Sequence, residues 1–547
     1  MRNNLLEGLS DNIHIDKDKC VFCGVCVERC IVDNLRLRVA PCRQSCPLGV
    51  NIQGYVQLTA RGQEDDARAQ LLEKLPFPSI IGHICDAECE QTCYRATHDG
   101  STVGINDLKR YLFNDPAVLE RIPLPECEKD TGKRVAIIGS GPAGLIAAYD
   151  LRLLGHEVTV FERADEPGGM LTQIIPEFRL PLSVARAEIG RLQKLGIKFQ
   201  CSCEAGVPGT PHALEALRRS YDAVIVATGL YEPKRLGIAG ENNANVMSAL
   251  PFLRAAKTKT APALHGKVAV IGGGNVAVDA ALTALRQGAT HVTMVSLEAR
   301  QELPAFKQEL AQAEQEGVIL ECSCGIARME FTGDNANALI LQECTSVCDA
   351  NGCFAPSFNP QVTKTLPVDY VLIAVGQNRD NAFMQHSGLN DAAVEKIDQE
   401  TLQLACPSLV GATDAVFAAG EWVSGPSSAI RAMASGRRAA ESAHLWLNGM
   451  PIDYARSSLG HVYDFEIDDS KGSALPKHSP PMHTMKNPGD WKLTRGVLNQ
   501  EQARGEATRC HSCGGPYGKY RTCWFCLPCE VECKQQALYV EIPYLMR

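Results

Sequence analysis

The order of apolar and polar positions between residues 133 and 163 predicts an α/β unit. A short β-branched run is followed by a glycine-rich turn, a stretch with helical apolar spacing and a second apolar run. The same succession recurs at 267–296. Short apolar runs that alternate with helices are typical of buried parallel strands, so the pattern predicts two Rossmann-like units in one chain.

Residues between Cys46 and Cys85 follow a different pattern. Apolar side chains such as Val56, Leu58 and Leu71 recur there at helical spacing, over about 40 residues. This predicts a small helical domain that brings the cysteines on its two sides together. The tail at 470–488 is rich in Pro, Lys and His, which indicates a tether rather than a packed segment.

Composition narrows the class of protein. The chain has 547 residues, 45% of them hydrophobic and 21% charged, as expected of several globular domains. Its net charge of −9, without any Lys/Arg-rich run, argues against a nucleic-acid partner. The longest apolar stretch, 268–285, is broken by glycines and by Asp279, and residues 1–10 contain no apolar signal core. We therefore expect a cytoplasmic protein with no membrane span.

The 24 cysteines add a second kind of chemistry, because they crowd at the two ends of the chain. Nine lie in residues 1–93 and six in residues 510–547. A disulfide scaffold would be shorter and would lack nucleotide-binding patterns. The spacing Cys-x2-Cys-x2-Cys-x3-Cys, typical of a [4Fe-4S] cluster loop, occurs near both ends. The candidate metal ligands are Cys20, Cys23, Cys26, Cys30, Cys42, Cys46, Cys85, Cys89, Cys93, Cys510, Cys513, Cys523, Cys526, Cys529 and Cys533.

The sequence leaves the number of metal sites open. The nine N-terminal cysteines suffice for two [4Fe-4S] clusters with one cysteine left over, and the C-terminal ones for a third. Cys510, Cys513, Cys523 and Cys526 would also fit a zinc ribbon, although Cys529 and Cys533 would then have no role. We expect at least three clusters, or two with zinc at the C-terminal cysteines.

Both α/β units carry a dinucleotide fingerprint. In the first, Gly139 permits a tight turn, Gly141 lets a pyrophosphate approach the helix N-terminus and Gly144 allows close helix–strand packing. Glu162, at the end of the second strand, can accept hydrogen bonds from a ribose. The second unit places Gly272, Gly274 and Ala277 at the three glycine positions. Two such units imply two dinucleotides.

Several further motifs give the chain a specific resemblance. They are EPGGML at 166–171, IPEFRLP at 175–181, ATG at 227–229 and VFAAGE at 416–421. With these motifs the chain is similar to the FAD-binding β-subunit of NADPH-dependent glutamate synthase. The same family includes the large subunit of electron-bifurcating ferredoxin:NADP transhydrogenase and one half of dihydropyrimidine dehydrogenase. The resemblance covers residues 40–450.

This resemblance implies a division of labour between the two units. The first unit would bind FAD and the second a nicotinamide. The second unit would be inserted between two halves of the FAD domain and would present the nicotinamide ring to the flavin for hydride transfer. The cofactors would carry out the chemistry, and the sequence leaves any catalytic residue of the protein unknown. The residues it implies for the two nucleotides are Gly139, Gly141, Gly144, Glu162, Gly169, Leu171, Arg179, Thr228, Gly420 and Glu421 for FAD, and Gly272, Gly274, Asn275, Ala277, Ser296 and Arg300 for NADP(H) or NAD(H).

The chain also departs from the family pattern. Asn34 and Leu37 stand where two cluster cysteines are usual, so Cys20, Cys23, Cys26 and Cys30 either form their own cluster or complete the depleted ones. Where the family places Tyr-Arg-Arg for the 2′-phosphate of NADP, this chain has Ser296, with Arg300 following. Because the ribose-binding acid is missing at Ser296, we expect a narrow preference for NADP(H). The acidic Glu298 favours NAD(H) instead.

The expected architecture is α/β, with an N-terminal helical iron-sulfur domain at 1–125 and a C-terminal ferredoxin-like segment at 453–547. The FAD domain would occupy 126–255 and 385–452, and the NAD(P)H domain 256–384. The resemblance implies an FAD and iron-sulfur subunit of a ferredoxin- or NAD-linked transhydrogenase, with other electron-transfer subunits or ferredoxin as partners. A glutamate synthase β-subunit and a non-catalytic electron-relay subunit are the alternatives.

Overall fold

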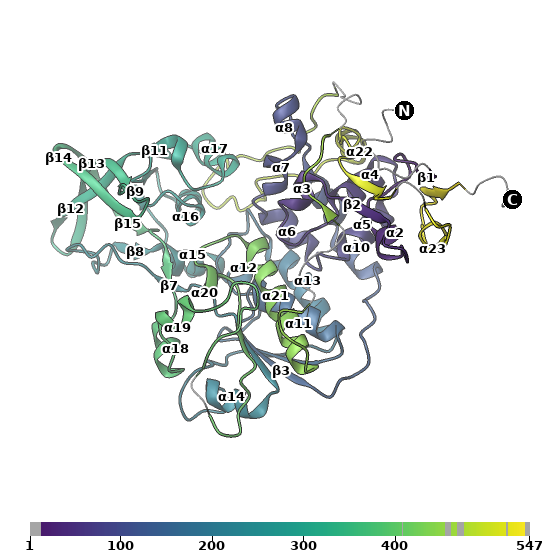
Figure 1. Ribbon diagram of the computed structural model, residues 1–547. Helices are drawn as coiled ribbons and strands as arrows, with labels where there is room; N and C mark the ends of the chain where they lie inside the picture. Colours follow the sequence, from purple (N-terminus) through teal and green to yellow (C-terminus); the bar gives the residue numbers. More distant parts are fainter. Residues whose placement is uncertain (1–11, 407–408, 455–460, 468–474, 521–522, 542–547) are drawn as a thin grey trace.

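The computed structural model describes residues 12–406, 409–454, 461–467, 475–520 and 523–541. Figure 1 shows three parts: the second α/β unit at the left, the first α/β unit at the bottom, and a helical part at the right. The first and last residues of the described chain both lie in the right-hand part.

The first α/β unit is built on a five-stranded parallel sheet in the order β17-β6-β3-β4-β5. Four of the five residues in β3 and in β4 are buried, as the apolar runs predict. The strands are β3 (Arg134–Ile138), β4 (Glu157–Phe161), β5 (Lys198–Gln200), β6 (Ala223–Val226) and β17 (Val416–Ala418). The helices are α11 (Pro142–Leu153), α12 (Met170–Gln173), α13 (Leu182–Lys194), α14 (Leu214–Ser220), α18 (Asn381–His386), α19 (Asp391–Glu395), α20 (Glu421–Ser424) and α21 (Ala429–Leu447).

The second α/β unit is inserted between β6 and β17 of the first. Its parallel sheet has the order β11-β10-β9-β15-β8, and an antiparallel meander, β12-β13-β14, lies beside it. The strands are β8 (Val246–Ser248), β9 (Lys267–Ile271), β10 (His291–Val295), β11 (Ile319–Glu321), β12 (Cys324–Thr332), β13 (Asn335–Cys348), β14 (Phe354–Pro367) and β15 (Tyr370–Ile373). The helices are α15 (Ala249–Lys257), α16 (Asn275–Arg286), the short 3-10 helix η1 (Arg300–Glu302) and α17 (Lys307–Gln315).

The boundary between the two units differs from the expected residue 256. Strand β8 and most of α15 precede that residue and belong to the second unit, because β8 pairs with β15. The chain crosses between the units at the short antiparallel pair β7 (Glu232–Pro233) and β16 (Gln377–Asn378).

The helical part has a core of apolar residues from the periodic positions, among them Val56, Leu58 and Leu71. Its helices are α3 (Pro41–Gln44), α4 (Ile52–Ala60), α5 (Glu64–Leu72), α6 (Pro78–Ile84), α7 (Glu88–Gln91), α8 (Tyr94–His98), α9 (Ile105–Phe113) and α10 (Pro116–Arg121). Helix α22 (Gln500–Thr508), from the tail, contacts α4 and α9 and so completes this part.

The two ends of the chain meet beyond the helices. Near the N-terminus lie β1 (Ile13–Ile15), α2 (Val25–Glu28) and β2 (Leu35–Arg38). From the tail come β18 (His461–Val462), β19 (Gly515–Gly518), α23 (Pro528–Val531) and β20 (Leu538–Val540). Strand β1 pairs with β20, and β2 lies between β18 and β19.

The expectation of a free tether at 470–488 is wrong over its described part. Within this part, the N–H of His478 donates to the Glu506 carboxylate at 2.7 Å, and Met485 packs against the core of the second unit. Just beyond it, the N–H of Gly489 donates to the carbonyl of Arg286 at 2.8 Å, and Trp491 packs against the same core. The described part of the segment is therefore held against the protein, although its composition predicted a tether.

Candidate nucleotide and iron-sulfur sites

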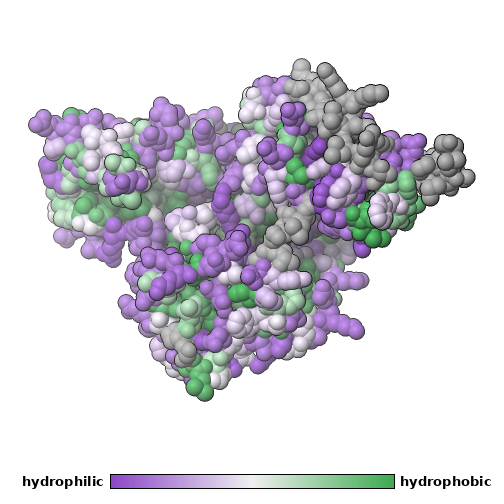
Figure 2. All heavy atoms as spheres, viewed as in Figure 1, coloured by the Kyte–Doolittle hydropathy of each residue, from purple (hydrophilic) through white to green (hydrophobic). Residues whose placement is uncertain are grey.

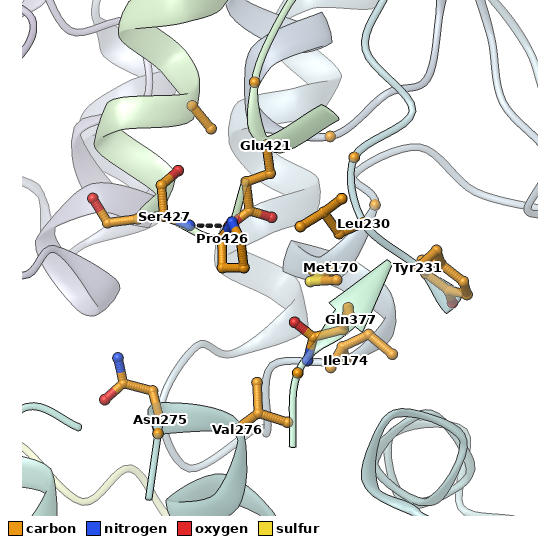
Figure 3. A pocket seen from close by; sticks show the side chains of 18 of the residues that line it. Met170, Ile174, Leu230, Tyr231, Asn275, Val276, Gln377, Glu421, Pro426 and Ser427 are labelled. Atoms are coloured by element: carbon orange, nitrogen blue, oxygen red, sulfur yellow. Dashed lines mark hydrogen bonds between the residues drawn. The ribbon is translucent and has the colours of Figure 1, made fainter. Parts of the chain in front are cut away.

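A cleft of about 1980 Å³ opens between the two α/β units and reaches the helical part. Both glycine turns line it, together with Ser45, Pro47, Ile84 and Asp86 of the helical part. Figure 3 shows Glu421 and Leu230 on one side, Asn275 and Val276 opposite, and Met170, Ile174 and Gln377 between them. The cleft therefore brings both nucleotide sites into one space.

The first glycine turn has the geometry that a pyrophosphate needs. Gly139 has a φ of 102°, which favours glycine, and a Cβ at Gly144 would lie 2.0 Å from the carbonyl oxygen of Gly139. A Cβ at Gly141, by contrast, would meet no described protein atom within 4 Å. Gly141 caps the N-terminus of α11 and faces the cleft, so the open space there fits a phosphate on a helix N-terminus.

Glu162 is held in place at the end of β4. Its carboxylate accepts hydrogen bonds from the backbone N–H of Ser140 at 3.0 Å and from that of Ala164 at 2.8 Å, and the Ser140 hydroxyl also donates to it. The residue is buried yet lines the cleft. Ser140, which the sequence pattern did not single out, thus fixes the acid beside the turn.

The flavin side of the cleft contains the residues implied by the resemblance. Gly169, Leu171, Thr228, Gly420 and Glu421 all line it. The buried Thr228 hydroxyl has no hydrogen-bond partner among the described residues, as expected where a bound group would supply one. Burial raises the pKa of Glu421, whose carboxylate accepts from the N–H of Ser427 at 2.8 Å.

Arg179 lines the cleft, but its guanidinium binds protein carboxylates. It donates to Asp279 of α16 at 2.7 Å and also to Glu309 of α17. The side chain is nearly buried. We expected Arg179 to approach the flavin; in the structure it joins the first unit to the second.

The second glycine turn repeats the geometry of the first. Gly272 has a φ of 136°, and a Cβ at Gly274 would meet no described protein atom within 4 Å. Asn275 begins α16, and its side-chain oxygen accepts from the N–H of Phe306 at 2.8 Å. Ala277 is fully buried beneath the turn and does not line the cleft.

The residues expected to determine the preference for NADP or NAD differ in whether they line the cleft. Ser296 and Glu298 line the cleft, and a Cβ at Gly273 would lie 3.0 Å from Glu298 Oε2, so this carboxylate reaches back to the glycine turn. Arg300 does not line the cleft, because its guanidinium pairs with Glu314 of α17. The acid, rather than the arginine, therefore faces the place expected for the ribose.

The cysteines of the helical part form two groups. Burial, and then the nearby thiols of Cys510, Cys89, Cys513 and Cys93, raise the pKa of Cys42. The tail cysteines reach this group because Gln53 donates to the carbonyl of Cys513 at 2.8 Å. Asn34 and Leu37, at the depleted family positions, lie next to or in β2, which pairs with β19 just beyond Cys513.

The second group consists of Cys46 and Cys85 together with Cys89, which lies near Cys42 as well and so adjoins both groups. It includes a residue that the sequence pattern missed, Lys109 of α9. Burial lowers the pKa of Lys109, but the thiols of Cys85, Cys89 and Cys46 outweigh this effect, so that its pKa is raised. Lys109 is 6% exposed, and because α9 also buries Asp107 and Arg110, nothing in the sequence pattern singled this lysine out.

A single-metal site is not built anywhere in the described ranges. No three His, Cys, Asp or Glu side chains there converge closely enough to hold one metal ion. A [4Fe-4S] cube binds each thiolate through a different iron, so its ligands stand farther apart than those of zinc.

Comparisons with known proteins agree with this geometry. Residues 133–436 match the family model of pyridine nucleotide-disulphide oxidoreductases. Residues 27–118 match that of dihydropyrimidine dehydrogenase domain II with a 4Fe-4S cluster, and residues 13–36 that of a 4Fe-4S binding domain. The fold and the site thus define a flavoprotein of the pyridine nucleotide-disulphide oxidoreductase class that also carries iron-sulfur domains.

Individual relatives narrow this class. The β-subunit of the NADP(+)-dependent formate dehydrogenase of Moorella thermoacetica is 32% identical over 87% of this chain and 70% of its own length. The small chain of the NADPH glutamate synthase of Azospirillum brasilense is 33% identical over 74% of this chain and 86% of its own. The chain belongs to the FAD and iron-sulfur family of the glutamate synthase β-subunit.

The structure of FprA from Mycobacterium tuberculosis in complex with NADPH covers 58% of this chain and 85% of its own, with 16% identity and a TM-score of 0.46. Within the part of the chain that the structure describes, no helix is both long and apolar enough to cross a membrane.

Proposed function

We propose that the chain exchanges hydride between NADP(H) and FAD and passes single electrons through [4Fe-4S] clusters to a partner. It would act as one subunit of a ferredoxin- or NAD-linked transhydrogenase. The observation that carries this proposal is the shared cleft, which extends from the second glycine turn past the first to the residues that flank Cys46 and Cys85. Relatives named as NADP- or NADPH-dependent support the choice of nicotinamide.

In this proposal the protein binds and orients, and the cofactors react. Flavin chemistry joins a two-electron hydride carrier to one-electron clusters. Gly141 and Gly274 leave room for the two pyrophosphates at helix N-termini, and Glu162 holds a ribose. Arg179 holds α16 and α17 against the first unit, which fixes the distance between the two binding sites.

The order of the cysteine groups supports an outward electron path. Ser45 and Pro47, which flank Cys46, line the cleft, whereas none of the tail cysteines does. We assign one cluster to Cys46, Cys85 and Cys89. We assign a second to Cys42, Cys93, Cys510 and Cys513, in which the tail replaces the cysteines missing at Asn34 and Leu37.

An apolar surface beside the outermost cysteines supports a partner there. Ile31, Trp524 and Val531 are 75%, 78% and 78% exposed, and Cys526 is exposed among them. Figure 2 shows apolar surface at the right, at the end of the molecule where Figure 1 places α23. Exposed aromatic and apolar side chains of this kind mark docking sites. A redox partner that docks here would receive electrons from the outermost cluster.

Two matched variants test the nucleotide assignments. Gly141→Leu and Gly274→Leu each project a side chain into open cleft, at backbone angles that any residue adopts, so both should fold. Gly141→Leu should lose FAD. Gly274→Leu should keep FAD but no longer be bleached by NADPH under anaerobic conditions. Full flavin retention by Gly141→Leu would refute the FAD assignment, and wild-type bleaching of Gly274→Leu would refute the nicotinamide assignment.

A glutamate synthase β-subunit is the second candidate, favoured by the long match to the Azospirillum protein. Anaerobic co-purification separates the two, because that role requires a glutamate synthase large chain as the partner. A relay subunit without nicotinamide chemistry would leave the flavin oxidised in the presence of NADPH.

A further inference from the structure

The two ends of the chain are built into a single small unit. Strand β1 pairs with β20, and the N–H of Asp16 donates to the carbonyl of Ala537 at 2.8 Å. The N–H of Glu541 donates to the carbonyl of Asn12 at 2.8 Å, and the side chain of Asn12 accepts from the N–H of Cys523 at 3.0 Å. The two cysteine runs, one near each end of the chain, therefore face each other.

These two runs have the same backbone conformation. Phe22 and Phe525, each two residues after the first cysteine, have left-handed φ values of 54° and 57°. Gly24 and Leu527, two residues later, have φ values of 91° and 69°. A leucine rarely adopts this left-handed conformation. Because Leu527 adopts it at the position equivalent to Gly24, the loop conformation is constrained in the same way at both ends.

The same backbone hydrogen bonds point at the cysteine sulfurs in both runs. The first cysteine of each run accepts from the N–H two residues on, at 3.4 Å, and the last accepts from the N–H four residues on, at 3.1–3.2 Å. Donors aimed at sulfur favour the thiolate, which is the form that binds iron. The pairs are Phe22 with Cys20, Phe525 with Cys523, Asn34 with Cys30 and Ala537 with Cys533.

The last cysteine of each run lies among the cysteines of the other run. Cys533 packs against the small buried cluster that Cys20 forms with Phe22 and Ala537. Cys30 packs against a second buried cluster, which contains Cys523 and Cys529 of the other run. Cys26 and Cys533 also belong to this second cluster, so the two runs interlock.

We propose that the two chain ends together form one two-cluster centre in which each run lends its fourth cysteine to the other. Cys20, Cys23, Cys26 and Cys533 hold one [4Fe-4S] cluster, and Cys30, Cys523, Cys526 and Cys529 hold the second. An exchanged fourth ligand is the arrangement of two-cluster ferredoxins, here divided between segments some 500 residues apart in the chain. Its role as the electron exit rests on the proposed function, but its assembly does not.

These ligand sets differ from those that the cysteine spacing alone predicts. Spacing assigned Cys533 to the C-terminal run and allowed the first run a cluster of its own. In the crossed arrangement neither cluster can form without the other end of the chain. The zinc ribbon is excluded by the same assignment, because Cys510 and Cys513 belong to the helical part and Cys523 and Cys526 to the terminal unit.

Two four-site alanine variants of the full chain distinguish crossed from uncrossed ligation. The first removes one complete crossed set, and should lose about four iron atoms while its other clusters stay intact. The second removes the whole C-terminal run, and should lose those four and also damage the N-terminal cluster, giving further iron loss or a three-iron electron paramagnetic resonance signal. The substituted residues are Cys30, Cys523, Cys526 and Cys529 in the first variant, and Cys523, Cys526, Cys529 and Cys533 in the second.

The measurement is iron and sulfide per chain after anaerobic purification, with spectra of the oxidised and reduced protein. Equal losses from the two variants, or a greater loss from the first, would refute the crossed assignment. The single variants Cys30→Ser and Cys533→Ser provide a milder test, and each should affect a different cluster signal. Flavin content and bleaching by NADPH should be normal in all four proteins, and a failure there would count against the proposed function instead.

Discussion

Glu298 offers a direct test of how the second unit distinguishes NADPH from NADH. Its carboxylate approaches the glycine turn, with Oε2 only 3.0 Å from where a Cβ on Gly273 would lie. The 2′-phosphate of NADPH must pass this side of the turn, because the acid at the end of the second strand of such a unit normally binds the ribose. We expect Glu298→Ala to improve the use of NADPH relative to NADH.

The size of the effect follows from Coulomb's law. At a separation of about 5 Å, a unit charge pair is worth about 0.8 kcal/mol in water and about 3 kcal/mol near a protein surface. Glu298 is half-buried, so removing its repulsion of the phosphate should gain about 1–3 kcal/mol. This corresponds to about a 5- to 150-fold rise in the ratio of kcat/KM for NADPH to that for NADH.

The assay is anaerobic reduction of a dye at saturating dye, with kcat/KM measured for each nicotinamide at two salt concentrations. Arg300→Ala is the matched control, since Arg300 pairs with Glu314 outside the cleft and should leave the ratio unchanged. The gain from Glu298→Ala should shrink at high salt. An unchanged ratio in Glu298→Ala would refute the repulsion of the phosphate by Glu298, and a fall of the ratio in Arg300→Ala would show that Arg300 reaches the phosphate after all.

Three further predictions concern stability and the contact between the units. Burial, and then His444, lower the pKa of His156 to about 4, so the unfolded chain binds a proton below pH 6.5 that the folded chain excludes; this residue should contribute about 2 kcal/mol less stability at pH 5 than at pH 7, and in urea unfolding His156→Gln should shift the difference between the two pH values by that amount. Arg286 and Glu316 form a fully buried ion pair, so Glu316→Ala should lose about 3–5 kcal/mol in the same assay, with recovery in the double variant with Arg286→Met. Arg179→Met should slow bleaching by NADPH about tenfold or more in stopped flow while flavin content stays normal, because the nicotinamide unit loses its anchor to Asp279; an unchanged rate would refute that role.

Local sequence patterns predicted the geometry of the two glycine turns well. Gly139 and Gly272 occupy positive φ at the ends of buried strands, and Gly144 packs against the turn, because a fingerprint of this kind is encoded within about 30 residues. The orientation of charged side chains was less predictable. Arg179 and Arg300 both have protein carboxylates as partners, and those carboxylates lie on helices 14 to 130 residues away.

Cysteine spacing predicted the loops but not their partners. The left-handed turns at Phe22 and Phe525 follow from the runs themselves, whereas the nearness of Cys533 to Cys20 depends on the pairing of β1 with β20. Composition also misled at the tail, because Met485 and the following Trp491, which stacks on Phe178, pack against the second unit. Long-range contacts of this kind leave no periodic trace in the sequence.

The pairing of β1 with β20 has a consequence for biogenesis. His14 and Glu541, which lie within hydrogen-bond distance across this pair, are separated by 527 positions. At about 5–20 residues per second, a ribosome needs roughly 25–100 s to synthesise the chain between them. In the proposed crossed arrangement, Cys20, Cys23 and Cys26 therefore cannot complete their cluster until Cys533 has been synthesised. Iron in the terminal unit would then be found only in chains that have been translated as far as Cys533.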